Sequence, residues 1–305
     1  GWGGAGARRW AVAGRGVEPG PGGVGRLSWT TPPNNRQSLD HRLWNLQGVE
    51  GAVQRRRTTM SLVVVGQMLP EGAIKGGSAM ALRFGRASRF TRDLDAAWVQ
   101  SFDQFRVDLE ESLAAGWAGF TGRLVERAAP RPVGVPAVYV MRPFDVRLAY
   151  RGQSWCTARF ELGHNEIGDS EEPEYRLAGD LVDLFTEVGL PVPRPVPVMR
   201  ADHQIAQKLH AASSPGSDRA RDLVDLQLLD AGEELDVSAV GVTCQRLFVY
   251  RRQQQWPPTL TVGDGWGALY AAAADGLDVL ASVDEAVVWV NAFITRITEA
   301  HQGDK

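Results

Sequence analysis

The sequence predicts an α/β (α+β) fold, in which a mixed sheet with flanking helices is followed by a mostly helical C-terminal region. Three observations predict it. Apolar residues recur at helical spacing early in the chain, at Leu39, Leu43 and Leu46. In the middle, "FDVRLAY" and "TARFELGH" alternate with period two, as half-buried strands do. After "PVPRPVPV", helical spacing returns and dominates the rest of the chain.

Composition limits the classes of protein that need to be considered. The 305 residues suit one large domain or two modest ones, and the apolar fraction of 44% is typical of a globular protein. The formal net charge of −3 gives no general attraction for nucleic acid, so any basic surface must be local. Two cysteines, Cys156 and Cys244, make neither a disulfide framework nor a cysteine-based zinc site. This cysteine usage fits a reducing cytoplasm, and the longest apolar runs are too short to cross a bilayer, so we expect a cytoplasmic protein without a membrane partner.

The chain divides into three predicted parts. Residues 1–34 form an extension rich in Gly, Pro and Arg, without hydrophobic periodicity. Residues 35–230 would form the main domain, which opens on a helix with Ser38 as its N-cap and continues with a buried helix over "TTMSLVVVGQML". Residues 231–305 would form a helical C-terminal region, interrupted by "QQQWPPT" and "GDGWG".

Within the main domain, short elements alternate. "GAIKGG" predicts a strand that stops at its glycines, and "SAMALRFG" predicts a short helix ending at Gly85. "TRDLDAAWVQ" alternates as a strand should. Residues 103–116 and 119–128 have the spacing of amphipathic helices. The two alternating segments that follow predict an antiparallel hairpin joined by Gly152 and Gln153.

Two carboxylates stand side by side on one predicted strand. Residues two apart on a strand point to the same face, so Asp93 and Asp95 share a face and Leu94 turns into the core. Two like charges held this close repel each other unless a cation lies between them. Mg²⁺ or Mn²⁺ is the natural cation, because it prefers oxygen ligands and completes its shell with substrate phosphates. The alternative is a solvated acidic edge at a turn, which is the commoner origin of an isolated Asp-x-Asp.

A glycine-rich turn precedes this pair. Gly76 and Gly77 let the backbone approach a ligand closely, and Ser78 offers a hydroxyl where the next helix begins. Backbone N–H groups at a helix N-terminus attract phosphate. Such a turn alone is equally an ordinary N-cap. A Gly-Gly-Ser, a short helix and then Asp-x-Asp on the next strand form a much more specific combination, and they favour a nucleotide-phosphate site.

The stretch "KGGSAMALRFG…RFTRDLDA" resembles the first motif of the DNA polymerase β-like nucleotidyltransferases, in particular the AbiE-type toxin branch. That branch includes tRNA-modifying toxins of mycobacteria. Arg89, Phe90 and Thr91 precede the aspartate pair in the order typical of the branch. The resemblance covers about residues 35–300 and implies a polymerase β-like fold, and it places Gly77, Ser78 and Arg89 at the nucleotide.

The resemblance also implies a third metal-binding carboxylate on a neighbouring strand, as two-metal phosphoryl transfer requires. Along "TARFELG", Ala158, Phe160 and Leu162 form one face, and Glu161 points to the other. Glu161 is therefore the first candidate. Asp145 on the preceding strand is the second and Glu166 the third, and a solvent-facing edge carboxylate without a metal remains the alternative.

A second stretch, "QIAQKLHAASSPGSDRARDLVDL", is similar to the later motif of the same branch. The resemblance implies that Lys208 meets the nucleoside triphosphate, where an ammonium offsets developing charge. It implies that Asp222 belongs to the nucleotide-binding site, where it orients Lys208 or a nearby arginine, and that Asp225 is structural. Taken alone, this stretch would read as a solvated helix with ordinary salt bridges.

The function that follows is that of a toxin of a toxin–antitoxin system. It would transfer NMP from an NTP to an acceptor, and the resemblance implies that this acceptor is the 3′ end of tRNA and that translation is blocked. A cognate antitoxin is implied, with or without a stable complex. Basic clusters at Arg55–Arg57, Arg83/Arg86/Arg89 and Arg251/Arg252 are candidate RNA contacts. The alternatives are a degenerate fold that only binds NTP or a partner, and a transferase acting on a protein or small molecule.

Overall fold

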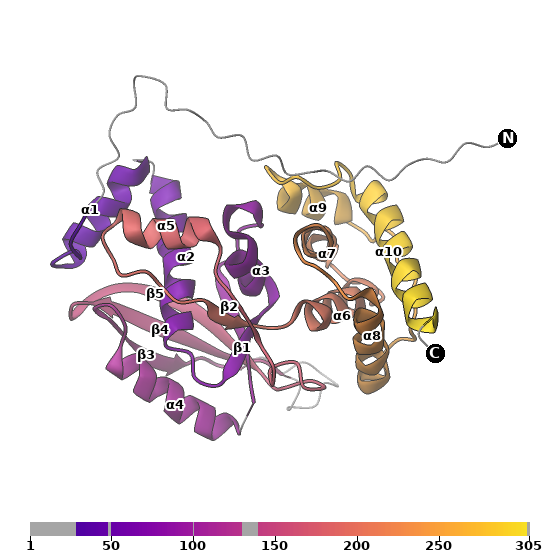
Figure 1. Cartoon of the computed structure of the whole chain (residues 1–305), viewed down its shortest axis with the longest axis horizontal. Coiled ribbons are helices and arrows are strands. Elements are labelled where there is room, and N and C mark those ends of the chain that lie inside the picture. Colours follow the sequence, from indigo (N-terminus) through magenta and orange to yellow (C-terminus); the bar gives the residue numbers. More distant parts are fainter. Residues whose placement is uncertain (1–28, 48–49, 100, 130–139, 304–305) are drawn as a thin grey trace, which may run out of the picture.

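The computed structural model describes residues 29–47, 50–99, 101–129 and 140–303, so most of the expected N-terminal extension lies outside the described residues. The sheet-containing part runs through α1 (Arg36–Gln47), α2 (Glu50–Gln67), β1 (Gly72–Lys75), α3 (Gly76–Phe84), η1 (Gly85–Ala87), β2 (Asp93–Trp98), α4 (Phe102–Ala115), β3 (Phe120–Glu126), β4 (Arg142–Tyr150), β5 (Gln153–Gly163), β6 (Glu174–Arg176), α5 (Gly179–Glu187) and β7 (Val196–Val198). It is followed by α6 (Ala201–Ala212), α7 (Ala220–Gly232), α8 (Val237–Arg251), α9 (Trp266–Ala274) and α10 (Val283–Gly303) (Figure 1).

The described strands form one mixed sheet of seven strands in the order β3-β4-β5-β2-β1-β7-β6. β2 runs parallel to β5, and β1 runs parallel to β7, whereas the other neighbours are antiparallel. Because β2 lies between β1 and β5, segments distant in sequence flank its aspartates. The predicted mixed sheet with flanking helices is confirmed.

Helices α2 and α4 both pack on the face of the sheet that carries Ile74 and Phe144, since Gly66 of α2 lies against Ile74 and the Phe102 ring of α4 stacks on Phe144. The buried apolar side chains divide into two clusters. One joins the sheet with α1, α2, α4 and α5, and the other joins α6 to α10. Helix α3 contributes to both, since Ala79 and Leu82 belong to the first cluster and Met80 to the second. The helix that carries the Gly-Gly-Ser is therefore clamped between two cores.

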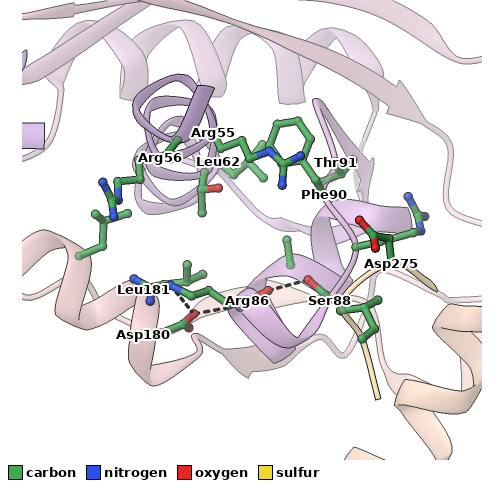
Figure 2. Close-up of a pocket in the computed structure, with 18 of the residues that line it drawn as sticks. Arg55, Arg56, Leu62, Arg86, Ser88, Phe90, Thr91, Asp180, Leu181 and Asp275 are labelled. Carbon is green, nitrogen blue, oxygen red and sulfur yellow. Dashed lines mark hydrogen bonds and ion pairs between the residues drawn. The ribbon is translucent and has the colours of Figure 1, made fainter. Parts of the chain in front are cut away.

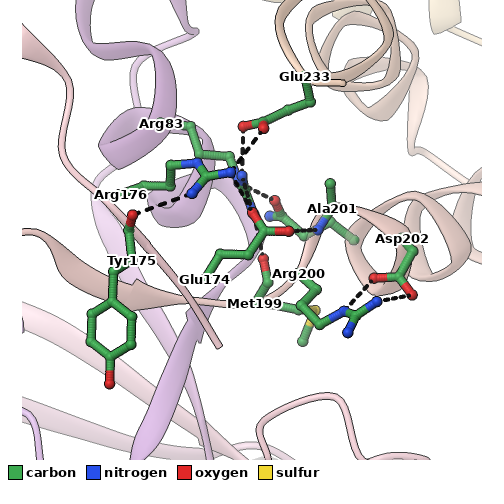
Figure 3. Close-up of polar contacts among 10 residues, drawn as sticks. Arg83, Glu174, Tyr175, Arg176, Met199, Arg200, Ala201, Asp202 and Glu233 are labelled. Carbon is green, nitrogen blue, oxygen red and sulfur yellow. Dashed lines mark hydrogen bonds and ion pairs between the residues drawn. The ribbon is translucent and has the colours of Figure 1, made fainter. Parts of the chain in front are cut away.

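A buried arginine also connects the two clusters. The Arg83 side chain is fully buried, and its Nη1 lies 2.7 Å from Oε2 of Glu174 and 2.6 Å from Oε1 of Glu233. It also donates to the Met199 carbonyl at 2.7 Å and to Gln204. Figure 3 shows these groups converging from α3, β6, the end of β7 and the end of α7. Arg83 is thus a structural cation, and it is not available to RNA as its basic cluster suggested.

Several local predictions are confirmed and three are wrong. The helix expected over 103–116 is α4, capped by the Ser101 side chain, which accepts from the Gln104 N–H. Residues 119–128 form the edge strand β3 and not a helix. Asn35, not Ser38, caps α1, because its side chain accepts from the Ser38 N–H. The hairpin turns at Arg151 and Gly152, which both have positive φ, and Gln153 already pairs with Tyr150. No helix in the described part of the chain is long and apolar enough to span a bilayer.

Candidate active site

The sheet places a lysine and two carboxylates in one row. In strand register, Lys75 of β1 lies opposite Asp95 of β2, and Asp95 lies beside Glu161 of β5. Directly paired residues share a face of the sheet, so these three side chains emerge on the same side, with Asp93 two residues along. Leu94 turns the other way and is completely buried. The two aspartates and Glu161, predicted separately, are brought together by the parallel pairing of β2 and β5.

The Gly-Gly-Ser turn fixes the position of Asp95. The Ser78 hydroxyl donates to the Lys75 carbonyl at 2.8 Å and accepts from the Asp95 N–H at 3.1 Å. Gly76 has φ +63°, and a Cβ on it would stand 2.3 Å from Oδ2 of Asp95. A Cβ on Gly77 would stand 3.0 Å from the Arg89 guanidinium. Gly76 is therefore required by its positive φ and by the approach of Asp95, whereas a side chain at Gly77 would press on Arg89, and the Ser78 hydroxyl is engaged with the backbone.

The row concentrates negative charge in a partly buried place. Burial raises the pKa of the Asp95 carboxyl to about 6, with Glu161 and Asp93 acting in the same direction and Lys75 and Lys208 opposing them. Oδ1 of Asp93 is buried and has no hydrogen-bond partner. An unpartnered carboxylate oxygen inside a protein is costly and calls for a cation or donor.

These carboxylates fit the metal that the nucleotidyltransferase resemblance implies. Mg²⁺ and Mn²⁺ take carboxylate oxygens, and the orphaned oxygen of Asp93 and the crowded carboxylate of Asp95 supply them. Within the described residues, no three His, Cys, Asp or Glu side chains are already gathered as a metal site. Asp93, Asp95 and Glu161 are thus the residues that would hold such an ion, with Glu161 reaching it from the neighbouring strand.

The later motif forms a buried charge cluster next to this row. Lys208 of α6 donates to Asp222 at 3.0 Å and to Asp225 at 2.6 Å, and both aspartates lie on α7. Arg89 makes a two-pronged contact with Asp225, at 3.0 and 2.9 Å. Although burial alone would lower the pKa of Lys208, the two aspartates raise it, so the ammonium stays charged. Lys208 is buried rather than projecting freely, and Asp225 is the centre of the cluster.

The two alternative third carboxylates are engaged elsewhere. Asp145 of β4 shares the face of Glu161 but lies one strand further from Asp95 and forms a 3.7 Å ion pair with Arg127. Glu166 lies in the loop after β5, where it is paired with Arg251 of α8 at 2.5 Å. Glu161 alone among the three candidates lies directly beside Asp95.

Two residues near the row were not singled out from the sequence. The positive charge of Lys75 lowers the pKa of Asp95. A Cβ on Gly163 would stand 2.6 Å from Nζ of Lys75, so Gly163 leaves room for the lysine ammonium. Gln204 donates to the Gly76 carbonyl at 3.1 Å and accepts from Arg83, which ties the glycine turn to α6. The position of Lys75 directly before the two glycines is a sequence signal that could have identified it. Nothing local marked Gln204.

A cavity of about 380 Å³ lies on the far side of α3, between α2, η1, α5 and the end of α9. Figure 2 shows Arg55, Arg56 and Arg86 around it, with the partly exposed ring of Phe90. The Arg55 guanidinium lies 5.3 Å from the centroid of that ring. Arg86 is paired with Asp180 at 3.7 Å. Of the predicted basic clusters, Arg55, Arg56 and Arg252 have no ion pair among the described residues, whereas Arg57 and Arg251 are bound to Asp40 and Glu166.

Comparison with protein families gives a match over residues 67–287 to the model described as "Nucleotidyl transferase AbiEii toxin, Type IV TA system". The match spans most of the chain and both candidate motifs. The chain belongs to the AbiEii family. It is therefore a nucleotidyltransferase of the kind found in type IV toxin–antitoxin systems, and AbiEii membership implies an NTP as substrate and an antitoxin as counterpart.

Among solved structures, the AbiEii chain is similar to MenT4, a nucleotidyltransferase toxin from Mycobacterium tuberculosis. The two sequences are 18% identical, the match covers 87% of this chain and 88% of that chain, and the TM-score is 0.46. It is also similar to an antigenic nucleotidyltransferase-like protein from Paracoccidioides brasiliensis, with 15% identity, 64% and 89% covered, and a TM-score of 0.35. Comparison with curated proteins finds no match.

Proposed function

We propose that this AbiEii chain transfers NMP from an NTP to the 3′ end of tRNA in a metal-dependent reaction, and that the modified tRNA blocks translation. The observation that carries the transfer is the row of Lys75, Asp95 and Glu161, with the unpartnered oxygen of Asp93 beside it. The tRNA acceptor follows from the resemblance to tRNA-modifying toxins. A soluble cytoplasmic site of action is part of the same proposal.

In this reaction the acceptor hydroxyl oxygen forms a bond to the α-phosphorus, the bond from that phosphorus to the bridging oxygen breaks, and pyrophosphate leaves while the hydroxyl loses its proton. A bound divalent ion supplies charge neutralisation at the phosphates. Asp93, Asp95 and Glu161 would hold that ion. Ser78 and Gly76 hold the Asp95 backbone and leave space for its carboxylate. Lys208, kept charged by its two aspartates, adds a fixed positive potential beside Asp95.

The test is transfer of label. The protein is incubated with each α-labelled NTP, Mg²⁺ or Mn²⁺ and total RNA, and the labelled macromolecule is identified. We expect tRNA to gain label with the parent chain. Asp95→Asn should abolish labelling while the protein stays folded, and Asp264→Asn, which removes an exposed loop carboxylate, should leave it intact. Full activity of Asp95→Asn would refute the assignment of the row.

The same reaction separates the competing acceptors. If a protein or small molecule gains label and the RNA does not, the result would favour a transferase with a different acceptor. NTP binding without any transfer would favour a fold that only binds nucleotide. Toxicity gives an independent measurement, because chemical damage to tRNA requires the carboxylates. Expression of the parent should stop growth, Asp95→Asn should not, and equal toxicity of the two would contradict the enzymatic account.

A further inference from the structure

One face of the sheet beside the candidate carboxylates is open. Along β4, Phe144, Val146 and Leu148 are buried, whereas Arg147 between them is exposed. On the buried face, the Phe102 ring of α4 stacks on Phe144 at 6.1 Å. β5 alternates in the same way from Thr157 to Glu161. An alternation this regular means that one face carries the core and the other meets solvent.

Strand register places three arginines on the open face. Arg123 of β3 pairs with Arg147 of β4, and Arg147 pairs with Thr157 of β5. Arg159 lies two residues beyond Thr157, on the same face, and is the direct neighbour of Asp93 on β2. One exposed arginine therefore stands on each of the three strands next to β2. Since neighbouring strands are about 4.8 Å apart, the set extends roughly 14 Å from Asp93 across the sheet.

These three guanidinium groups are not neutralised by the protein. Arg123, Arg147 and Arg159 form no ion pair or hydrogen bond with any other described residue. Two acids on this face neighbour Arg159 in register: Asp145 on β4, which has its ion pair with Arg127, and Asp93 on β2. The contrast with Arg83 and Arg89 is clear, because those two are buried against carboxylates. The open face thus carries unpaired positive charge in a chain whose net charge is negative.

We propose that this surface, the arginine row Arg123–Arg147–Arg159, binds the phosphodiester backbone of the nucleic-acid acceptor. A guanidinium fork matches the geometry of a phosphate and remains charged at any physiological pH. A single strand lying along the row would reach Asp93 at the Arg159 end, with its terminal hydroxyl on the face where the carboxylates emerge. The row therefore aligns the acceptor, and the cavity behind α3 is not required for this task.

The inference rests on the proposed function for the acceptor class, but its test does not depend on catalysis. Binding of a short fluorescent single-stranded RNA is followed by anisotropy at several salt concentrations. The variant Arg123→Gln/Arg147→Gln removes two of the row's charges and spares Arg159, which lies against Asp93. The charge-matched control Arg106→Gln/Arg194→Gln removes the half-buried Arg106 of α4, which pairs with Glu110, and the exposed Arg194 of the loop before β7.

Each phosphate contact on a single strand adds about 0.7 to the slope of log K against log salt. Loss of two contacts should therefore lower the slope by about 1.4 and weaken RNA binding roughly 25-fold near 0.1 M salt. The control should bind RNA as the parent does, and both double variants should bind the metal–NTP with unchanged affinity. RNA affinity of the row variant equal to that of the parent, an equal loss in the control, or no RNA binding by the parent would overturn the inference.

The two proposals fail in different measurements. If the parent labels RNA and the row variant binds and labels it equally well, the arginine row is wrong and the transferase stands. If the parent binds RNA through the row but transfers no NMP to it, the proposed reaction is wrong and the row remains an RNA-binding surface.

Discussion

Asp225 holds together the charge cluster beside the carboxylate row, and its neutralisation should be strongly destabilising. Its side chain is completely buried and accepts from Lys208 and from both prongs of Arg89. These two cations keep the pKa of the Asp225 carboxyl low, although burial alone would raise it. Asp225→Asn preserves the shape of the side chain and removes the charge, leaving a buried lysine and a mostly buried arginine facing one remaining aspartate.

Removal of one partner from a buried ion pair costs about 3–5 kcal/mol. The asparagine oxygen can still accept one hydrogen bond, so we expect the free energy of unfolding to fall by about 3 kcal/mol. Asp222→Asn is the matched comparison. It breaks a single contact, to Lys208 at 3.0 Å, and should cost about 1–2 kcal/mol.

Denaturant unfolding followed by tryptophan fluorescence measures both values, since the chain contains 10 tryptophans. Lys208→Met combined with Asp225→Asn should cost less than the sum of the single variants, because the double variant leaves no unpaired Lys208 charge. If Asp225→Asn costs under about 1 kcal/mol, or no more than Asp222→Asn, the cluster is not organised around Asp225 and the reasoning fails.

Three further outcomes are expected. Gly76→Ala should abolish NMP transfer at a modest cost in stability, because its Cβ would displace the Asp95 carboxylate from its place; transfer at the parent rate would show that this carboxylate can move freely. Burial and the nearby charge of Arg251 lower the pKa of His210 to about 4. Between pH 6.5 and 4 the imidazole is therefore neutral in the folded protein and protonated in the unfolded chain, so acid favours unfolding. Because solvent screens part of this effect, the parent should lose about 1–2 kcal/mol more stability than His210→Gln as pH falls through that window, and parallel pH–stability curves would contradict this. Arg83→Met should lower the free energy of unfolding by about 3 kcal/mol, since Glu174 and Glu233 then keep only the half-exposed Arg176 as a partner, and a change below 1 kcal/mol would mean that Arg176 and solvent already compensate them.

The local parts of this site can be predicted from the sequence. Period-two alternation placed Asp93 and Asp95 on one face with Leu94 buried behind them, because side-chain direction on a strand depends only on the strand's own geometry. The Gly-Gly-Ser followed by a helix was equally local, and Gly76 does adopt the positive φ that glycine allows. The two family motifs and their order were also readable from the sequence.

Local reasoning failed where two residue patterns overlap. Residues 119–128 have apolar positions at helical spacing, yet they form β3 because pairing with β4 at the sheet edge outweighs their propensity. Gly116 and Gly119 were the signal in the sequence for a break before this segment, and both adopt positive φ where the chain turns out of α4 into β3. The extended connector before α6 ends in β7 for the same reason, since its last residues pair with β1 and β6.

Which charges meet depends on contacts between segments that are distant in the sequence. Glu161 is beside Asp95 because β2 and β5 pair in parallel in a particular register, and register is a property of two segments rather than one. Lys208 and Arg89, far apart in sequence, are both buried against Asp225, whereas Arg123, Arg147 and Arg159 find no carboxylate partner. The free energy of a charge depends on its burial and on its partners, and both arise from contacts between distant segments. The sequence therefore specified the chemical groups of this nucleotidyltransferase, and the packing of its sheet and helices assigned each group its surroundings.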